Sequence, residues 1–224
     1  AVTAALFGFL VGLPTLRLKG DYLAIATLGM AEIIKVIFIN LDSITNGAAG
    51  LNNIPQFVTW PWMFLFTAGT ILIITNLLNS SHGRACISIR EDEIASEAMG
   101  INTTKYKVAA FTIGAFFAGI AGALYASNFY FIEPNQFGFL KSIDVLVIVV
   151  FGGMGSISGS VIAATALAVI STLLQSFSEV RMILYAVLLV IIMIFRPQGL
   201  MGSKELSLSV LGRLGNSDSK KGRV

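Results

Sequence analysis

Apolar residues form long blocks along this 224-residue chain, and short polar stretches separate the blocks. Because about 20 apolar residues are needed to cross a bilayer as a helix, blocks of this length predict membrane spans. Charged side chains are absent from three long intervals, Asp42 to Arg84, Lys107 to Glu133 and Asp144 to Glu179. The pattern predicts six apolar segments: Ala1 to Leu16, Tyr22 to Asn40, Trp60 to Leu78, Val108 to Phe131, Asp144 to Leu174 and Val180 to Phe195.

The fifth segment contains a glycine cluster in the run GGMGSISGS, with Gly152, Gly153, Gly155 and Gly159. A glycine costs about 1 kcal/mol in a helix interior. The cluster therefore predicts a turn between two spans, which brings the expected number of crossings to seven. The expected fold is all-α and polytopic.

The composition agrees with a membrane protein. Hydrophobic residues make up 55% of the chain and charged residues 12%, whereas a soluble domain carries about 25% charged residues. Mean hydropathy is +0.83 and the isoelectric point is near 9.1. The basic residues flank apolar segments and form no patch interleaved with aromatic residues, so we expect a lipid bilayer and no nucleic acid as partner.

The distribution of Lys and Arg predicts the topology, since cytoplasmic loops carry an excess of both. If the linkers at 17–19, 84–107 and 152–159 and the chain from Arg196 onward are cytoplasmic, twelve of the fifteen Lys and Arg residues lie inside. The connector from Leu41 to Val58 then faces out, and so does Ala1. An outer start predicts that one or more further spans precede this chain. We expect a transmembrane domain over 1–203, with a cytoplasmic loop over 79–107, and a polar, basic, disordered tail over 204–224.

Two features inside the spans stand out. Small residues recur every fourth position at Gly114, Ala118, Gly122 and Ala126, with Ala115 and Gly119 adjacent to them. Such a stripe lets another helix approach closely.

Glu32 and Lys35 are three residues apart, and Glu32 is expected near mid-membrane, where ionisable groups are costly. They either form a structural ion pair or line the translocation path. As path candidates we name Thr27, Gly29 and Glu32.

Recognisable catalytic or nucleotide-binding motifs are absent from the sequence. It contains one histidine, His82, one cysteine, Cys86, and no GxxxxGK[ST] loop. We therefore expect neither enzyme activity nor a bound cofactor or metal.

The stretch SIREDEIASEAMGINTTKYK, from Ser88 to Lys107, is unusually charged for this chain. Ser88 and Glu91 have the spacing of a capping box, and Gly100 is placed to end a helix. The pattern predicts a helix from about Ile89 to Met99. Such a helix is either a solvated connector or a docking element, and its apolar residues favour docking.

Several long motifs resemble one family: LRLKGDYLAIATLGMAEIIKVIF, TNGAAGLNNIP, GRACISIREDEIASEAMGINTTKYK, VIVVFGGMGSISGSVIAATAL and VLLVIIMIFRPQGLMG. The chain is similar to permease subunits of branched-chain amino-acid ABC importers, of the LivM type, over about Leu16 to Gly202. The resemblance implies the transmembrane fold of ABC importers and a place in a bacterial or archaeal plasma membrane. It also implies import of leucine, isoleucine or valine.

The resemblance further implies partners. These are a related second permease, LivH-like, two cytoplasmic ATPases that use ATP, and an external solute-binding protein that delivers the amino acid. EIASEAMG matches the cytoplasmic signature of such permeases loosely, through Glu93, Ala95 and Gly100. The residues implied to couple with the ATPases are Arg90, Glu91, Asp92, Glu93, Ile94, Ala95, Glu97, Ala98, Met99 and Gly100.

Other functions stay open at this point. A urea or amide importer permease is the nearest alternative, and a ribose-type sugar permease matches less of the chain. An ion-coupled secondary transporter with Glu32 as coupling group would need no ATPase and leaves the helix at 89–99 without a role.

Overall fold

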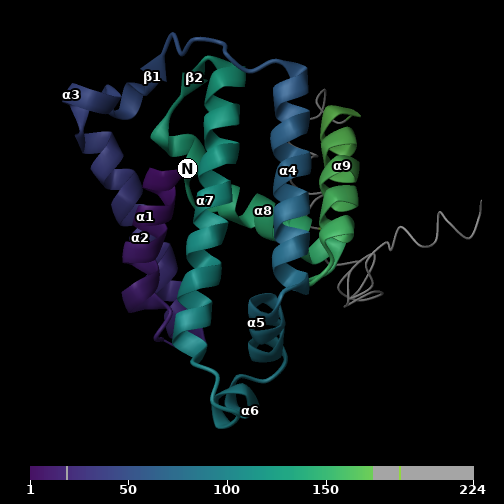
Figure 1. Cartoon of the computed structure of the whole chain (residues 1–224). Coiled ribbons are helices and arrows are strands. Elements are labelled where there is room, and N and C mark those ends of the chain that lie inside the picture. The colour runs from purple at the N-terminus through teal and green to yellow at the C-terminus, as the bar shows by residue number, and fades with distance from the viewer. Residues whose placement is uncertain (19, 174–186, 188–224) are drawn as a thin grey trace, which may run out of the picture. The chain divides into compact units, whose positions relative to one another are not determined.

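A computed structural model describes residues 1–18, 20–173 and 187 (Figure 1). The chain divides into two compact units, Ala1–Lys141 and Ser142–Val224, and each is described by itself. Lys19, the expected last span at 180–195 and the expected tail at 204–224 lie outside the described residues.

The first unit is built on four apolar helices that match the first four expected segments. They are α1 (Val2–Thr15), α2 (Asp21–Asn40), α4 (Trp60–Asn79) and α7 (Thr103–Phe129). Within the described part of the chain, α2, α4 and α7 are long and apolar enough to cross a membrane, and α1 is a shorter apolar helix. The prediction of a polytopic helical membrane protein is confirmed, whereas the count of seven spans is not.

The long helices bury little of their apolar surface against one another. None of the hydrophobic stretch of α2 or of α4 is buried, and only 6% of that of α7 is. A helix that is hydrophobic and exposed in this way needs lipid or another subunit around it. The surface of the unit is therefore that of a membrane protein.

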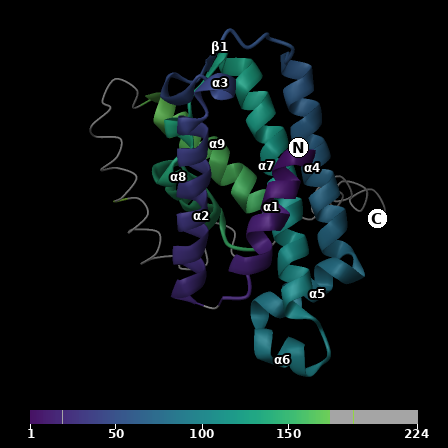
Figure 2. The same ribbon diagram turned by 90° about the vertical axis from the view of Figure 1, so that its left-hand side faces the viewer.

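The closest helix packing in the first unit joins α1 to α7, and in Figure 2 α1 lies between α2 and α7. A side chain at Gly8 would collide with Cβ of Ala115, and one at Gly119 would lie 2.6 Å from Cβ of Ala4. The expected small-residue stripe is thus used through its neighbours Ala115 and Gly119. Gly114 and Gly122 face open space, where an added Cβ would meet no atom within 4 Å. The prediction of close helix packing is therefore confirmed for Ala115 and Gly119 and is wrong for Gly114 and Gly122.

At one end of the first unit, short elements form a cap over the helices. They are α3 (Asp42–Thr45), η1 (Gly47–Ala49), β1 (Leu51–Asn52), β2 (Phe131–Ile132) and η2 (Pro134–Phe137). The antiparallel pair β1–β2 places Leu51 opposite Ile132. This small ladder is the departure from the expected all-α fold.

The glycines of TNGAAGLNN are required by this cap. Gly50 has φ +72°, and a side chain there would collide with the carbonyl oxygen of Ile132. Gly47 has φ +58°, and a side chain added there would collide with the Asp42 carboxylate. Glycine is therefore needed for the backbone conformation and for the close approach of β1 to β2.

The described part of the second unit contains most of α8 (Phe139–Gly152), which begins in the first unit, and α9 (Ile157–Leu173). Between them Gly153 and Gly155 both have φ +110°, so the predicted glycine turn is confirmed. A side chain at Gly152 would lie 2.6 Å from the carbonyl carbon of Gly159. Behind this contact the helices bury a core of Val147, Phe151, Ala163 and Leu167.

Candidate functional site

The charged loop folds into two helices beyond the ends of α4 and α7, at the end of the first unit opposite to the cap (Figure 1). They are α5 (Ser81–Glu91) and α6 (Glu93–Ala98). The predicted single helix at Ile89–Met99 is wrong, because Asp92 adopts an extended conformation, with φ −151° and ψ 110°, and divides it.

The capping box expected at Ser88 is also wrong. Ser88 lies inside α5, and its hydroxyl donates to the carbonyl of Ala85. The cap of α5 is Ser80, whose Oγ accepts a hydrogen bond from the Gly83 amide at 3.2 Å. Only Ser80 therefore separates the end of α4 at Asn79 from the start of α5 at Ser81, and Ser88 lies inside α5 instead of beginning a helix.

Side chains fix both ends of the connection around α6. Oδ1 of Asp92 accepts from the Ala95 amide at 2.9 Å and caps α6, and Oδ1 of Asn102 accepts from the Lys105 amide at 3.0 Å and caps α7. Each such cap contributes about 1 kcal/mol. The loop is thus a defined structure with three capped helix starts in succession.

Gly100 ends α6 as predicted. Its φ is +84°, and the Ile101 amide donates to the Ser96 carbonyl at 3.1 Å while the Gly100 amide donates to the Glu97 carbonyl at 3.0 Å. This is the pattern of a glycine helix terminus.

One ion pair and one buried side chain attach α6 to the neighbouring elements. Nζ of Lys107 on α7 lies 2.6 Å from Oε2 of Glu93, and both side chains are about three-quarters buried. Ser96 is 5% exposed. The side of α6 that carries Glu93 and Ser96 is therefore packed against its neighbours, and the opposite side of the helix faces outward.

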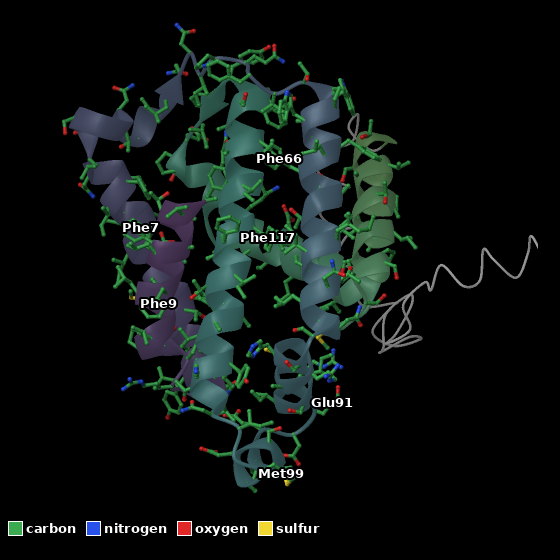
Figure 3. All side chains as sticks on the ribbon, viewed as in Figure 1. Phe7, Phe9, Phe66, Glu91, Met99 and Phe117 are labelled. Carbon is green, nitrogen blue, oxygen red and sulfur yellow. The ribbon has the colours of Figure 1, made fainter. Side chains whose placement is uncertain are left out.

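The free side of α6 carries large apolar side chains. Ile94 is 78% exposed and Met99 is 83% exposed, and Figure 3 shows Met99 at the outer tip of the loop. Arg90 pairs with its neighbour Glu91 at 2.5 Å. The remaining residues of the expected coupling set that are exposed are Asp92, Ala95, Glu97, Ala98 and Gly100.

Basic side chains gather at the α6 end of the unit. Arg17, which follows α1, lines the same groove as Asn102 and Lys105, a groove of about 760 Å³. Arg84, Arg90 and Lys107 belong to the loop itself or to the first turns of α7. The end of the first unit that carries α6 is therefore rich in Lys and Arg, as the topology prediction expects of the cytoplasmic side.

The three candidates for the translocation path do not meet in one cavity. Thr27 lines a cleft of about 600 Å³ between α1, α2 and α7, and its hydroxyl donates to carbonyls of its own helix. A Cβ added at Gly29 would meet no atom within 4 Å, so this glycine faces open space. Glu32 is the twelfth of the 20 residues of α2 and pairs with Lys35 at 2.5 Å.

A further cavity, which the sequence did not indicate, lies under the cap, and we name it the cap pocket. Its volume is about 340 Å³. Helix α2 contributes Ala31, Ile34, Lys35 and Phe38, the connector contributes Thr45, Gly50 and Leu51, and the segment after α7 contributes Ile132, Glu133, Pro134 and Phe137. The pocket is apolar apart from the threonine, one cation and one carboxylate.

Metal-ligating side chains do not cluster among the described residues. In residues 1–18, 20–173 and 187, no group of three or more His, Cys, Asp or Glu side chains could hold a metal ion. Burial raises the pKa of the Cys86 thiol on α5, so this cysteine is a poor nucleophile.

Comparison with known proteins identifies the family. The sequence pattern of a family described as branched-chain amino acid transport system / permease component matches residues 1–195. The chain is 38% identical to the high-affinity branched-chain amino acid transport system permease protein LivM of Salmonella typhimurium, over 89% of the chain and 55% of that protein. It is 39% identical to LivM of Escherichia coli, over 88% of the chain and 55% of that protein.

More distant similarity extends to a second permease. The chain is 31% identical to the permease protein LivH of Salmonella typhimurium, over 65% of the chain and 47% of that protein. No solved structure matches the chain. The chain spans about half the length of the LivM proteins it matches.

Proposed function

The chain belongs to the permease family of branched-chain amino acid transport systems, and from that premise we propose that it forms part of the membrane permease of an ATP-driven importer of leucine, isoleucine and valine. Its partners in this proposal are a second, LivH-like permease, two cytoplasmic ATPases and an external solute-binding protein. ATP is bound and hydrolysed by the ATPases, and this chain moves the substrate.

The observation that carries the proposal is the construction of α6. A helix of six residues does not hold its shape alone, because helix nucleation is unfavourable. Here Asp92 caps it, Gly100 ends it and the Glu93–Lys107 pair attaches it to α7. The result is a rigid projection that presents Ile94 and Met99 outward.

Such a projection suits docking in a groove of an ATPase. The two apolar side chains would supply buried contact area, and the charges around them would set orientation. Closure of the ATPase pair on ATP would then displace α6 as a rigid body. Because α6 is attached to α7, the displacement would repack the spans between outward- and inward-facing states.

The charge distribution supports this orientation. The end with α6 carries Arg17, Arg84, Arg90, Lys105 and Lys107, and by the positive-inside rule it is cytoplasmic, where the ATPases are. The cap pocket then lies at the external end, on the side of the solute-binding protein.

Affinity purification of the full-length protein from its native membrane tests the proposal. The expected result is co-purification of two ATPases and a LivH-like permease, together with ATP-dependent leucine uptake after reconstitution. The double variant Ile94→Ser, Met99→Ser should lose the ATPases and keep the second permease. Phe57→Ser is a matched control, because Phe57 is as exposed as Ile94, at 78%, but lies at the cap end. This variant should retain the ATPases and the second permease. Retention of the ATPases by the double variant would refute the docking role of α6, and uptake without any ATPase would refute the whole proposal.

A further inference from the structure

We propose that the cap pocket is a binding site for a branched-chain amino acid on the permease itself, at the external end of α2. The inference rests on the proposed function and adds a substrate site within this chain.

The pocket has the chemistry that such a ligand needs. A branched-chain amino acid carries an ammonium, a carboxylate and a branched apolar side chain. Lys35 is a cation for the carboxylate, Glu133 is an anion for the ammonium, and Ile34, Phe38 and Phe137 are apolar walls. The volume of 340 Å³ falls in the range of about 300 to 1,000 Å³ that is typical of small-molecule sites, which are mostly apolar with a few polar groups that fix orientation.

Both charged groups keep the capacity to bind a ligand. Lys35 pairs with Glu32 at 2.5 Å, but an ammonium has three donors, so donors remain for a substrate carboxylate. The Lys35 side chain is 23% exposed, which reduces competition from water. Glu133 takes part in none of the ion pairs found among the described residues.

A buried polar atom without a partner also occurs in η2, on a residue that does not itself line the pocket. Gln136 lies between the lining residues Pro134 and Phe137, and its Oε1 is buried without a hydrogen-bond partner among the described residues. Buried polar atoms are rarely left unpaired, and such an exception calls for a missing donor.

The backbone of the cap also adopts the left-handed conformation at three residues other than glycine, none of which itself lines the pocket. Asn46, Asn53 and Tyr130 have φ of 57°, 61° and 58°, which is uncommon for residues other than glycine. Conformations of this kind gather at ligand sites, where the surrounding structure maintains them. Together with the glycine contact of Gly50 on Ile132, they hold β1 and β2 over the pocket.

Site-specific cysteine labelling of the full-length transporter in nanodiscs, without the solute-binding protein, tests the inference. Leu51→Cys places a thiol in the pocket wall, and Asn52→Cys places one on the next residue, which points to the opposite face of the strand. Labelling by a maleimide is read by mass at each residue. Leucine at ten times its Kd should slow labelling of residue 51 by roughly tenfold and leave residue 52 unchanged.

Variants of Lys35 and Glu133, and leucine analogues that lack one charged group, test the contribution of each charge to binding. Lys35→Met and Glu133→Gln should each abolish the protection by leucine, while Lys35→Arg should keep part of it. Isoamylamine lacks the carboxylate and 4-methylpentanoate lacks the ammonium, so neither should protect. Thr45→Cys, in another wall, is a second reporter if Leu51→Cys does not assemble.

The outcomes distinguish this inference from the proposed function. If the wild-type transporter imports leucine but leucine protects neither reporter, the pocket is not the site and the proposed function stands. Equal protection by 4-methylpentanoate would show an apolar pocket without amino-acid recognition. If the wild-type transporter imports none of the three amino acids, the proposed function itself fails.

Discussion

Nζ of Lys107 on α7 lies 2.6 Å from Oε2 of Glu93, the first residue of α6. This ion pair joins a short, exposed helix to a helix that is long enough to span a membrane. The connection between the two is otherwise made by the turn at Gly100 and by the Asn102 cap. The pair is therefore a direct mechanical link between the proposed docking element and a span.

Removal of this link by Lys107→Met should weaken coupling. A partly buried ion pair of this kind contributes about 1 kcal/mol, which corresponds to about a fivefold change in an equilibrium. We expect the number of leucine molecules imported per ATP hydrolysed to fall by up to about fivefold in proteoliposomes, with ATPases still bound.

The exchanged pair Glu93→Lys, Lys107→Glu is the matched control for that experiment. It restores opposite charges at the same two positions and should recover most of the coupling ratio. An unchanged ratio in Lys107→Met would show that α6 and α7 move together without the pair.

Replacement of Gly100 by alanine should loosen α6 without a change in membrane insertion. At φ +84° an alanine costs roughly 1–2 kcal/mol, and the strain falls on the hydrogen bonds to Ser96 and Glu97. Amides of residues 93–101 should exchange with deuterium about tenfold faster, as measured by mass spectrometry. Gly69→Ala on α4, where the added Cβ meets no atom within 4 Å, is the control; similar exchange in both variants would contradict the assigned role of Gly100.

The α1–α7 contact should be sensitive to a single methyl group. Gly8→Ala introduces a collision with Ala115, and overpacking typically costs about 1–3 kcal/mol. We expect a lower Tm for the detergent-solubilised protein. Gly114→Ala on the open face of α7 should leave Tm unchanged or raise it, because alanine is the better helix former. Equal Tm values for the two variants would mean that α1 and α7 separate easily.

The long apolar helices could be predicted because the bilayer demands a fixed length of apolar residues, which is visible in the sequence alone. The helix starts in the charged loop could not be predicted with the same success. Ser80 and Ser88 both have the side chain of a cap, and only the end of α4 at Asn79 decides that Ser80 is used. Asp92 likewise has the side chain of a cap, and it acts as one because α5 ends at Glu91.

The candidate sites also differ in how much of them could be predicted from the sequence. The position of Glu32 in mid-helix and the stop at Gly100 depend on neighbours in the chain and were predicted correctly. The pairing of Glu32 with Lys35 was one of the two alternatives that the sequence left open, and the structure contains this pair. The cap pocket joins Lys35 to Glu133 through pairing of β1 with β2, elements of two residues each. No local pattern marks such short strands, so this pocket is visible only in three dimensions.

The reactivity of Cys86 should report on the packing of α5. Burial raises the pKa of its thiol, and because the thiolate is the nucleophile, a higher pKa leaves less of the reactive form at any given pH. We expect iodoacetamide to label Cys86 several-fold more slowly than an exposed cysteine near neutral pH, with a rate that rises at higher pH than for the exposed thiol. Asn135→Cys in a Cys86→Ser background is the exposed comparison, and both rates are followed by mass spectrometry of the full-length protein. If the two thiols titrate at the same pH, α5 does not pack on its neighbours as described.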